Sequence, residues 1–173
     1  MTGIALRPDS RESIPGPMVK DAADRPQSGR FADGVHLFPV RVFFEDTDFT
    51  GVVYHANYLR FIERARSDML RVAGIDQRAA YEAGEGAYAV ARLAIDFKRS
   101  ARLDDELLVI SAIGEIRAAS VHIHQRVMRN GEVVAQAEVD VAFVSREGRP
   151  RRQPAEWREI FGAIAGQAIT GAK

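Results

Sequence analysis

The chain has 173 residues, of which 46% are hydrophobic, and this is enough apolar material for one ordinary domain with a single core. Its 24 basic and 24 acidic side chains cancel, so it has no overall field that would favour nucleic acid or an anionic membrane. Because cysteine is absent, disulfide frameworks, thiolate nucleophiles and cysteine-based zinc sites are excluded.

Residues 1–35 contain prolines, glycines and scattered charges without a helical or strand period, which predicts a disordered N-terminal tail. This segment also lacks the apolar stretch of a secretion signal. No later run reaches the ~18 apolar residues that a membrane span needs. We therefore expect a soluble, cytoplasmic protein with no membrane span.

The first regular elements are a strand and a long helix joined by an acidic turn. Apolar residues alternate from Phe38 to Phe44, which predicts a strand, and the early Pro39 suggests that it starts at a sheet edge or at a strand end. Gly51 permits a tight turn shortly after Asp48. An amphipathic helix of about five turns then begins at Tyr54.

The rest of the chain predicts more strands and a second helix. Alternating apolar residues indicate four strands, over residues 87–97, 107–116, 120–129 and 133–143. Helical spacing after Pro154 predicts a short C-terminal helix, so residues 151–173 are read as a helix and tail. The predicted fold class is α+β, with a five-stranded antiparallel sheet wrapped round one long central helix over residues 36–150.

Asp48 is predicted to lie beside the N-terminus of the long helix. Unpaired backbone N–H groups there, together with the helix dipole, can polarise a carbonyl oxygen and hold the negative charge that develops on it. A carboxylate alongside can attack the carbonyl carbon or activate a water molecule. These are the two parts that an acyl-transfer site needs.

One motif runs through this region, with the pattern Asp46-Thr47-Asp48-x-x-Gly51-Val52-Val53-Tyr54-His55-x-Asn57-Tyr58 and then Phe61-x-Glu63-x-Ala65-Arg66. The motif resembles the hotdog-fold acyl-CoA thioesterases, and within them the 4-hydroxybenzoyl-CoA thioesterase family and its Tol-Pal-associated, YbgC-like subgroup. The resemblance implies a hotdog fold, hydrolysis of an acyl-CoA to free acid and CoA, no cofactor, and a homodimer or homotetramer. Acyl carrier protein is a second candidate carrier of the acyl group.

The resemblance also implies roles for residues of the motif. Asp48 matches the catalytic carboxylate, which acts as nucleophile or as general base. His55 lies where the family's backbone N–H polarises the thioester carbonyl, and its imidazole is a candidate substrate contact. Gly51, Tyr54 and Asn57 flank this site and are expected to bind substrate.

A basic cluster follows the second predicted strand. Lys98, Arg99 and Arg102 form the best local group for the phosphates of CoA. A solvated loop is an equally good interpretation of the same three residues.

Several alternatives stay open at the level of sequence. Asp48 could serve only as a helix N-cap, a position for which aspartate is favoured. Glu63 is expected to form an i,i+3 ion pair with Arg60 or Arg66, whereas a hotdog hydratase would use Glu63 together with His55. A noncatalytic acyl-carrier or interaction module would use none of these groups for chemistry.

His122 and His124 form a His-x-His pair on one face of a predicted strand. This spacing occurs in metal sites. Because no third ligand is evident nearby in the sequence, no metal site is predicted.

Overall fold

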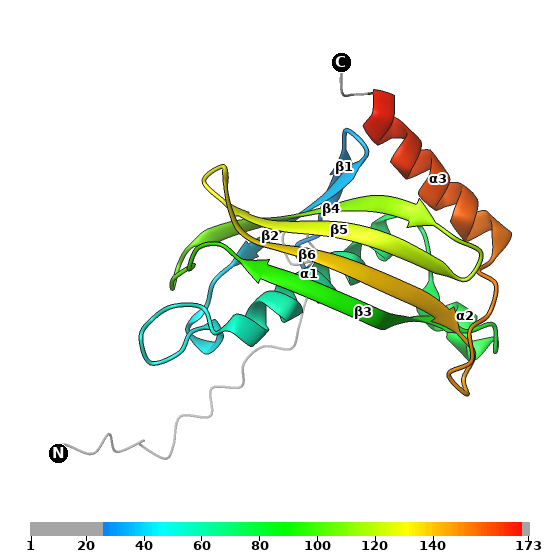
Figure 1. The fold of residues 1–173 in the computed structure, drawn as a ribbon, viewed down its shortest axis with the longest axis horizontal. Helices are drawn as coiled ribbons and strands as arrows, with labels where there is room; N and C mark the ends of the chain where they lie inside the picture. The colour runs from blue at the N-terminus through cyan, green and yellow to red at the C-terminus, as the bar shows by residue number, and fades with distance from the viewer. Residues whose placement is uncertain (1–25, 171–173) are drawn as a thin grey trace, which may run out of the picture.

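The computed structural model describes residues 26–170, with side chains described up to residue 166. It contains a six-stranded antiparallel sheet, curved over one long helix (Figure 1). In chain order the elements are β1 (Arg30–Ala32), β2 (Val35–Arg41), the 3-10 helix η2 (Phe44–Asp46), α1 (His55–Val72), α2 (Gln77–Glu82), β3 (Ala87–Phe97), β4 (Glu106–Ile116), β5 (Ser120–Arg129), β6 (Glu132–Val144) and α3 (Ala155–Thr170). The predicted α+β class and the long central helix are confirmed.

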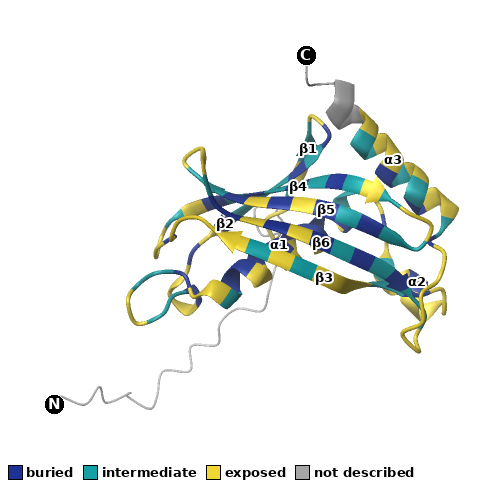
Figure 2. Ribbon diagram, in the orientation of Figure 1, coloured by how far each residue is buried: buried dark blue, intermediate teal, exposed yellow. Residues whose placement is uncertain are grey.

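The sheet has the strand order β1-β2-β4-β5-β6-β3. Short turns join β4 to β5 and β5 to β6, but β3 reaches the far edge of the sheet and pairs with β6. Edge position leaves most of β3 exposed, as Figure 2 shows. The sheet therefore presents one long, accessible strand edge.

The core lies between α1 and the concave face of the sheet. Apolar residues of α1 recur at helical spacing and are buried: Tyr58, Phe61, Ile62, Ala65 and Met69. They face the alternate, buried residues of the central strands, which include Val121, Ile123, Val127, Val139 and Val141. Each large side chain buried in this way contributes about 1.5–3 kcal/mol of stability, and the core fixes the orientation of α1.

The fold begins before the predicted boundary at residue 35. Residues 1–25 of the predicted tail lie outside the described residues, but β1 forms a hairpin with β2. The backbone N–H of Gly29 donates to the Asp68 carboxylate on α1 at 2.7 Å, and His36 Nε2 lies 2.9 Å from the same carboxylate. A three-residue strand is too short to show alternation, so sequence patterns missed it.

The strand before Asp48 is shifted relative to its prediction. β2 starts at Val35 and ends at Arg41, and Phe44 lies in η2 with an exposed side chain. The reason is local, because the buried Asp46 carboxylate accepts a hydrogen bond from the Phe43 N–H at 2.9 Å and closes a turn there. Asp46 is thus a turn residue.

Two helices complete the fold. The six-residue α2 was not predicted; its N-cap is Asp76, whose side chain accepts from the N–H of Ala79. The predicted C-terminal helix is confirmed as α3, whose Trp157 and Phe161 are buried near Tyr88. Residues 171–173 of the predicted tail lie outside the described range. No helix within residues 26–170 is long and apolar enough to cross a membrane.

Candidate active site

Asp48 is presented by a small, closed loop, residues 47–53, called here the Asp48 loop. Thr47 and Val53 form an antiparallel bridge at its base, and the Asp48 N–H donates to the Val52 carbonyl at 2.9 Å. Gly51 closes the turn with an N–H bond to the Asp48 carbonyl and has φ of 76°, a conformation that favours glycine. In Figure 1 this loop, in cyan, lies at the opposite end of the molecule from α3.

The turn also sets the charge of Asp48. Its Oδ1 accepts hydrogen bonds from the Thr50 hydroxyl at 2.6 Å and from the Thr50 backbone N–H at 2.8 Å. These bonds, the hydroxyl first, hold the pKa of the Asp48 carboxyl below its usual value, and the Val52 backbone adds to the effect. Asp48 is therefore an ionised, partly exposed carboxylate at neutral pH.

The capping alternative for Asp48 is wrong for α1. The N-cap of α1 is Tyr54, whose side chain makes no capping hydrogen bond, and the first turn carries no acidic residue. The first-turn N–H groups, starting at His55, thus lack a side-chain acceptor from the cap. These groups place a positive partial charge at the N-terminus of α1, which directly follows the Asp48 loop in the chain.

The start of α1 is held in place by the acidic turn. The Asp46 carbonyl accepts from the Tyr54 N–H and from the Asn57 side-chain amide, each at 2.9 Å. Asn57 is buried, and this bond gives it a structural role in the fold. Its predicted contact with substrate stays a prediction.

A second segment, the basic loop (residues 98–105), packs against the Asp48 loop. The Val53 N–H donates to the Ala101 carbonyl at 2.8 Å, and Val52 forms a bridge with Arg102. The Tyr58 hydroxyl on α1 accepts from the Ala101 N–H at 3.0 Å. Arg102 is therefore the predicted basic residue that the structure brings to the Asp48 loop.

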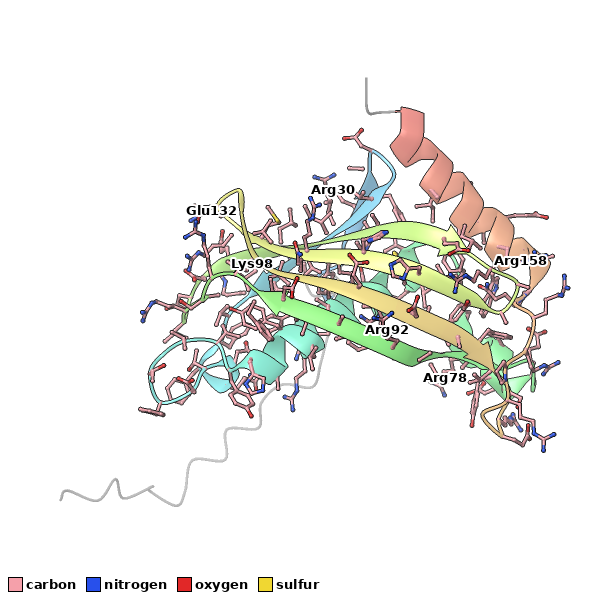
Figure 3. The ribbon with its side chains drawn as sticks, viewed as in Figure 1. Arg30, Arg78, Arg92, Lys98, Glu132 and Arg158 are labelled. Carbon is pink, nitrogen blue, oxygen red and sulfur yellow. The ribbon has the colours of Figure 1, made fainter. Side chains whose placement is uncertain are left out.

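Lys98 and Arg99 are engaged elsewhere. Lys98 Nζ lies 3.5 Å from the Asp96 carboxylate, and Arg99 Nε lies 3.3 Å from the Glu132 carboxylate. Figure 3 places Lys98 and Glu132 at the same end of the sheet. These pairs are exposed, so they are weak and can exchange partners.

Exposed apolar side chains gather at this end of the molecule. Nine large hydrophobic side chains are exposed in the described residues, and seven of them belong to residues 43–59 and 97–103. They are Phe43, Phe44, Phe49, Tyr54, Leu59, Phe97 and Leu103, with Phe49 fully exposed. The rings of Tyr54 and His55 lie 4.4 Å apart, and that of Phe97 lies 6.3 Å from His55. Concentrated apolar exposure indicates a binding surface.

Comparison with known proteins identifies the family. Residues 42–164 match the model of the Thioesterase-like superfamily. The acyl-CoA thioesterase YbgC of Haemophilus influenzae is 47% identical over 130 residues, which cover 75% of this chain and 96% of that protein. The chain belongs to the thioesterase-like superfamily. The predicted resemblance is confirmed.

Two further members agree with this assignment. The acyl-CoA thioester hydrolase YbgC of Escherichia coli is 40% identical over 119 residues, covering 68% of this chain and 88% of that protein. A crystal structure of a probable thioesterase from Bartonella henselae superposes with a TM-score of 0.65 at 35% identity, covering 69% of this chain and 99% of that one. The hotdog fold and the thioester hydrolase class predicted for this superfamily member are thereby confirmed.

Glu63 forms the expected ion pair, with Arg66 as its partner, and its carboxylate also accepts from the Ser67 hydroxyl at 3.3 Å. The Arg66 guanidinium donates in addition to the buried Gln125 side chain at 2.7 Å. A cleft along the middle of α1 is lined by Glu63 and Arg66 but by no residue of the Asp48 loop. Glu63 is therefore tied to the helix surface rather than to the candidate catalytic carboxylate.

Two carboxylates lie beside the His-x-His pair in the structure, although none is near it in the sequence. Strand pairing places Glu138 opposite His124 and Asp140 opposite His122. The two carboxylates come from β6, 14 to 18 residues away in the chain, so only the register of the sheet reveals them.

Proposed function

We propose that this protein hydrolyses acyl-CoA thioesters at the Asp48 loop and releases a free acid and CoA. The observation that carries the proposal is an ionised Asp48 in the turn that leads into the uncapped N-terminus of α1. The two YbgC relatives are named for the same reaction on acyl-CoA. The sequence of elements supports that chemistry because an ionised carboxylate lies in the turn that leads directly into a helix start with polarising amides.

In the proposed mechanism, a backbone N–H of the first turn of α1, at His55, donates to the thioester carbonyl oxygen and stabilises the developing oxyanion. As a nucleophile, the Asp48 carboxylate bonds to the carbonyl carbon while the C–S bond breaks and CoA leaves as thiolate; water then hydrolyses the mixed anhydride. As a general base, Asp48 instead takes a proton from the water that attacks the same carbon. Both routes give a carboxylic acid and the CoA thiol.

Substrate contacts are proposed for the residues near the position of the thioester carbonyl carbon. Gly51 keeps the turn free of a side chain, and the rings of Tyr54 and His55 provide an exposed aromatic surface for the acyl group. Arg102, beside the Asp48 loop, is the proposed partner of a CoA phosphate, since a guanidinium binds phosphate in bidentate fashion. Lys98 and Arg99 would join it after releasing their carboxylate partners.

We also propose that the active form is a homodimer, with a tetramer formed from two dimers. The outer edge of β3 is not paired with another strand within the described residues, and both Val90 and Phe97 on β3 are exposed. A second copy of the chain that adds its sheet along this edge would cover these groups. Cytoplasmic location, acyl carrier protein as a carrier, and a link to the Tol-Pal system remain predictions.

The hydratase alternative is not favoured by the contacts of Glu63. His55 and Glu63 are eight positions apart on α1, which corresponds to about 12 Å along the helix axis. Glu63 is also paired with Arg66. A noncatalytic acyl-binding role has no separate observation in its favour.

The test is a free-thiol release assay with the purified full chain and short, long and aromatic acyl-CoAs. We expect steady release of CoA thiol from at least one class of substrate. The matched acyl-acyl carrier proteins would then show which carrier is preferred. If no thiol is released from any acyl-CoA or acyl carrier protein by a folded sample, the hydrolase proposal is wrong.

A further inference from the structure

The convex face of the sheet, opposite α1, carries a compact group of ionisable side chains on two neighbouring strands. His122 and His124 lie two residues apart on β5, so both point to the same face. Register pairs His122 with Asp140 and His124 with Glu138 on β6. The neighbouring positions Val121 and Ile123 are buried against the core, which assigns the four polar side chains to the outer face. Four potential ligands thus form a two-by-two array.

Within this array two imidazoles converge on one point. His122 Nε2 lies 2.8 Å from Glu138 Oε2, and His124 Nδ1 lies 2.6 Å from the same oxygen. The two rings are 4.7 Å apart and nearly perpendicular, at 80°. One ligand atom from each of these three residues lies within 4.8 Å of the other two. Convergence of two imidazole nitrogens and a carboxylate is the donor arrangement of a transition-metal site.

Asp140 holds the His122 ring on the side opposite Glu138. Its Oδ1 lies 2.7 Å from His122 Nδ1, the ring nitrogen that points away from Glu138. A carboxylate that accepts from one nitrogen of an imidazole fixes the ring and leaves the other nitrogen free to bind a metal. This carboxylate–histidine relationship is an observation independent of the spacing of the two histidines.

The neighbouring strand leaves room for the rings. Gly114 on β4 lies beside both histidines, and a Cβ at this position would be 2.9 Å from His124 Nε2 and 3.2 Å from His122 Cδ2. A side chain at residue 114 would therefore push the His124 ring aside and crowd the His122 ring. The absence of a side chain at Gly114 thus leaves space for both rings.

The two carboxylates of the array differ in their other charged neighbours. The carboxylate of Asp140 is influenced by Arg92 and Arg117 as well as by His122. Glu138, in contrast, forms ion pairs only with the two histidines among the contacts of residues 26–166. Within residues 26–166, Glu138 therefore has no lysine or arginine ion-pair partner that would compete with a bound cation.

We propose that His122 Nε2, His124 Nδ1 and the Glu138 carboxylate bind one divalent transition-metal ion of the Zn²⁺ or Ni²⁺ type, with Asp140 as the positioning residue for His122. Bonds of about 2.0–2.2 Å in tetrahedral geometry place ligand atoms ~3.3 Å apart, so the contacts of Glu138 Oε2 with the two imidazole nitrogens, now 2.8 and 2.6 Å, must widen by less than ~1 Å. The Glu138 side chain is 55% exposed and is free to move by this amount. Water completes the coordination, and the ion clamps β5 to β6.

This site is separate from the proposed active site. None of its four residues belongs to the Asp48 loop, to α1 or to the basic loop. Metal binding is therefore a second property of the chain and does not depend on thioester hydrolysis.

The test is calorimetric titration of the full chain with Zn²⁺ after removal of metals by chelation. We expect one ion per chain for the wild type and loss of this binding in the double variant His122→Gln with His124→Gln. Asp140→Asn should weaken binding by about 10- to 100-fold, because the ring is no longer positioned. His55→Gln, which removes an exposed histidine elsewhere, is the matched control and should bind Zn²⁺ like the wild type.

A second readout guards against a variant that fails to fold. Co²⁺ bound to the wild type should give visible absorption bands that are lost in Glu138→Gln, with the fold of each variant checked by circular dichroism. The proposal is overturned if the wild type binds no ion at millimolar Zn²⁺. It is also overturned if binding survives in folded variants of His122, His124 and Glu138, or if it is lost with His55→Gln alone.

Discussion

Thr50 controls the ionisation of the proposed catalytic carboxylate. Its hydroxyl makes the hydrogen bond that contributes most to the lowered pKa of Asp48. Thr50→Val keeps the shape of the side chain but removes this donor, so the pKa of Asp48 should rise towards its usual value. The acidic limb of the kcat/KM profile against pH should then move to higher pH.

Thr47→Val is the matched control for this change. The Thr47 hydroxyl donates to the Phe44 carbonyl at 2.9 Å and makes no contact with Asp48 that would hold its charge. Its acidic limb should coincide with that of the wild type. If the acidic limb of the kcat/KM profile lay at the same pH for Thr50→Val and the wild type, Thr50 would not control the ionisation of Asp48.

At the scale of single residues, sequence patterns predict what is local. Asp48, Gly51 and His55 belong to one strand–turn–helix segment, so their proximity follows from chain order. The direction of the Thr50 hydroxyl follows from the turn geometry and was not predictable. Glu138 meets His122 and His124 only through the register between strands, which periodicity does not specify.

At the scale of elements, β1 and the residue before it secure one end of α1. Asp68 is a buried carboxylate that accepts from the Gly29 N–H and pairs with Arg71 and His36. Burial lowers the pKa of His36, so this imidazole is neutral at neutral pH and can give Asp68 a hydrogen bond from Nε2 but no positive charge. Removing Gly29 takes one hydrogen-bond donor away from the buried Asp68 carboxylate.

A chain that begins at residue 35 should therefore be less stable than a chain that begins at residue 26. Loss of the Gly29 bond and of β1 should lower the free energy of unfolding by about 1–3 kcal/mol. Urea denaturation of the two truncated chains measures the difference. Equal midpoints would mean that β1 and Gly29 add nothing to the fold. Equal midpoints are also what the sequence-based prediction of a disordered tail over residues 1–35 implies.

Element prediction succeeds where the pattern is long and fails where it is short. β5 was predicted to the residue, and the ten or more residues of each long strand supply repeated alternation. β1 has three residues and α2 has six, which is too few for a period to be recognised. The prediction that Phe44 lies in a strand is wrong. The chain turns there because the Asp46 carboxylate accepts a hydrogen bond from the Phe43 N–H, which strand propensity does not reveal.

At the scale of the whole molecule, the strand order was the least predictable property. The pairing of β3 with β6 joins segments that are far apart in the chain, and no local pattern encodes it. The consequence is an open β3 edge next to the exposed apolar side chains. This arrangement supports a dimer in which two sheets become continuous.

Light scattering of the purified chain at micromolar concentration should accordingly give a mass of at least twice 19.1 kDa. Val90→Lys, in the exposed part of β3, should shift the population towards monomer because a charge is then buried in the interface. Tyr81→Lys, at a similarly exposed residue of α2, should leave the mass unchanged. A wild type that is a folded monomer at this concentration would refute the proposed assembly.

The central claim is that the Asp48 carboxylate acts in the reaction, as nucleophile or as general base, and the most direct measurement compares Asp48→Asn with Glu63→Gln on one acyl-CoA substrate. We predict that Asp48→Asn lowers kcat by about 10²-fold or more, because the amide has neither charge nor basicity. Glu63→Gln removes the charged partner of the buried Arg66 guanidinium, so it should lower stability by about 1–3 kcal/mol while kcat stays near that of the wild type. Normal turnover by Asp48→Asn together with an inactive but folded Glu63→Gln would contradict the account.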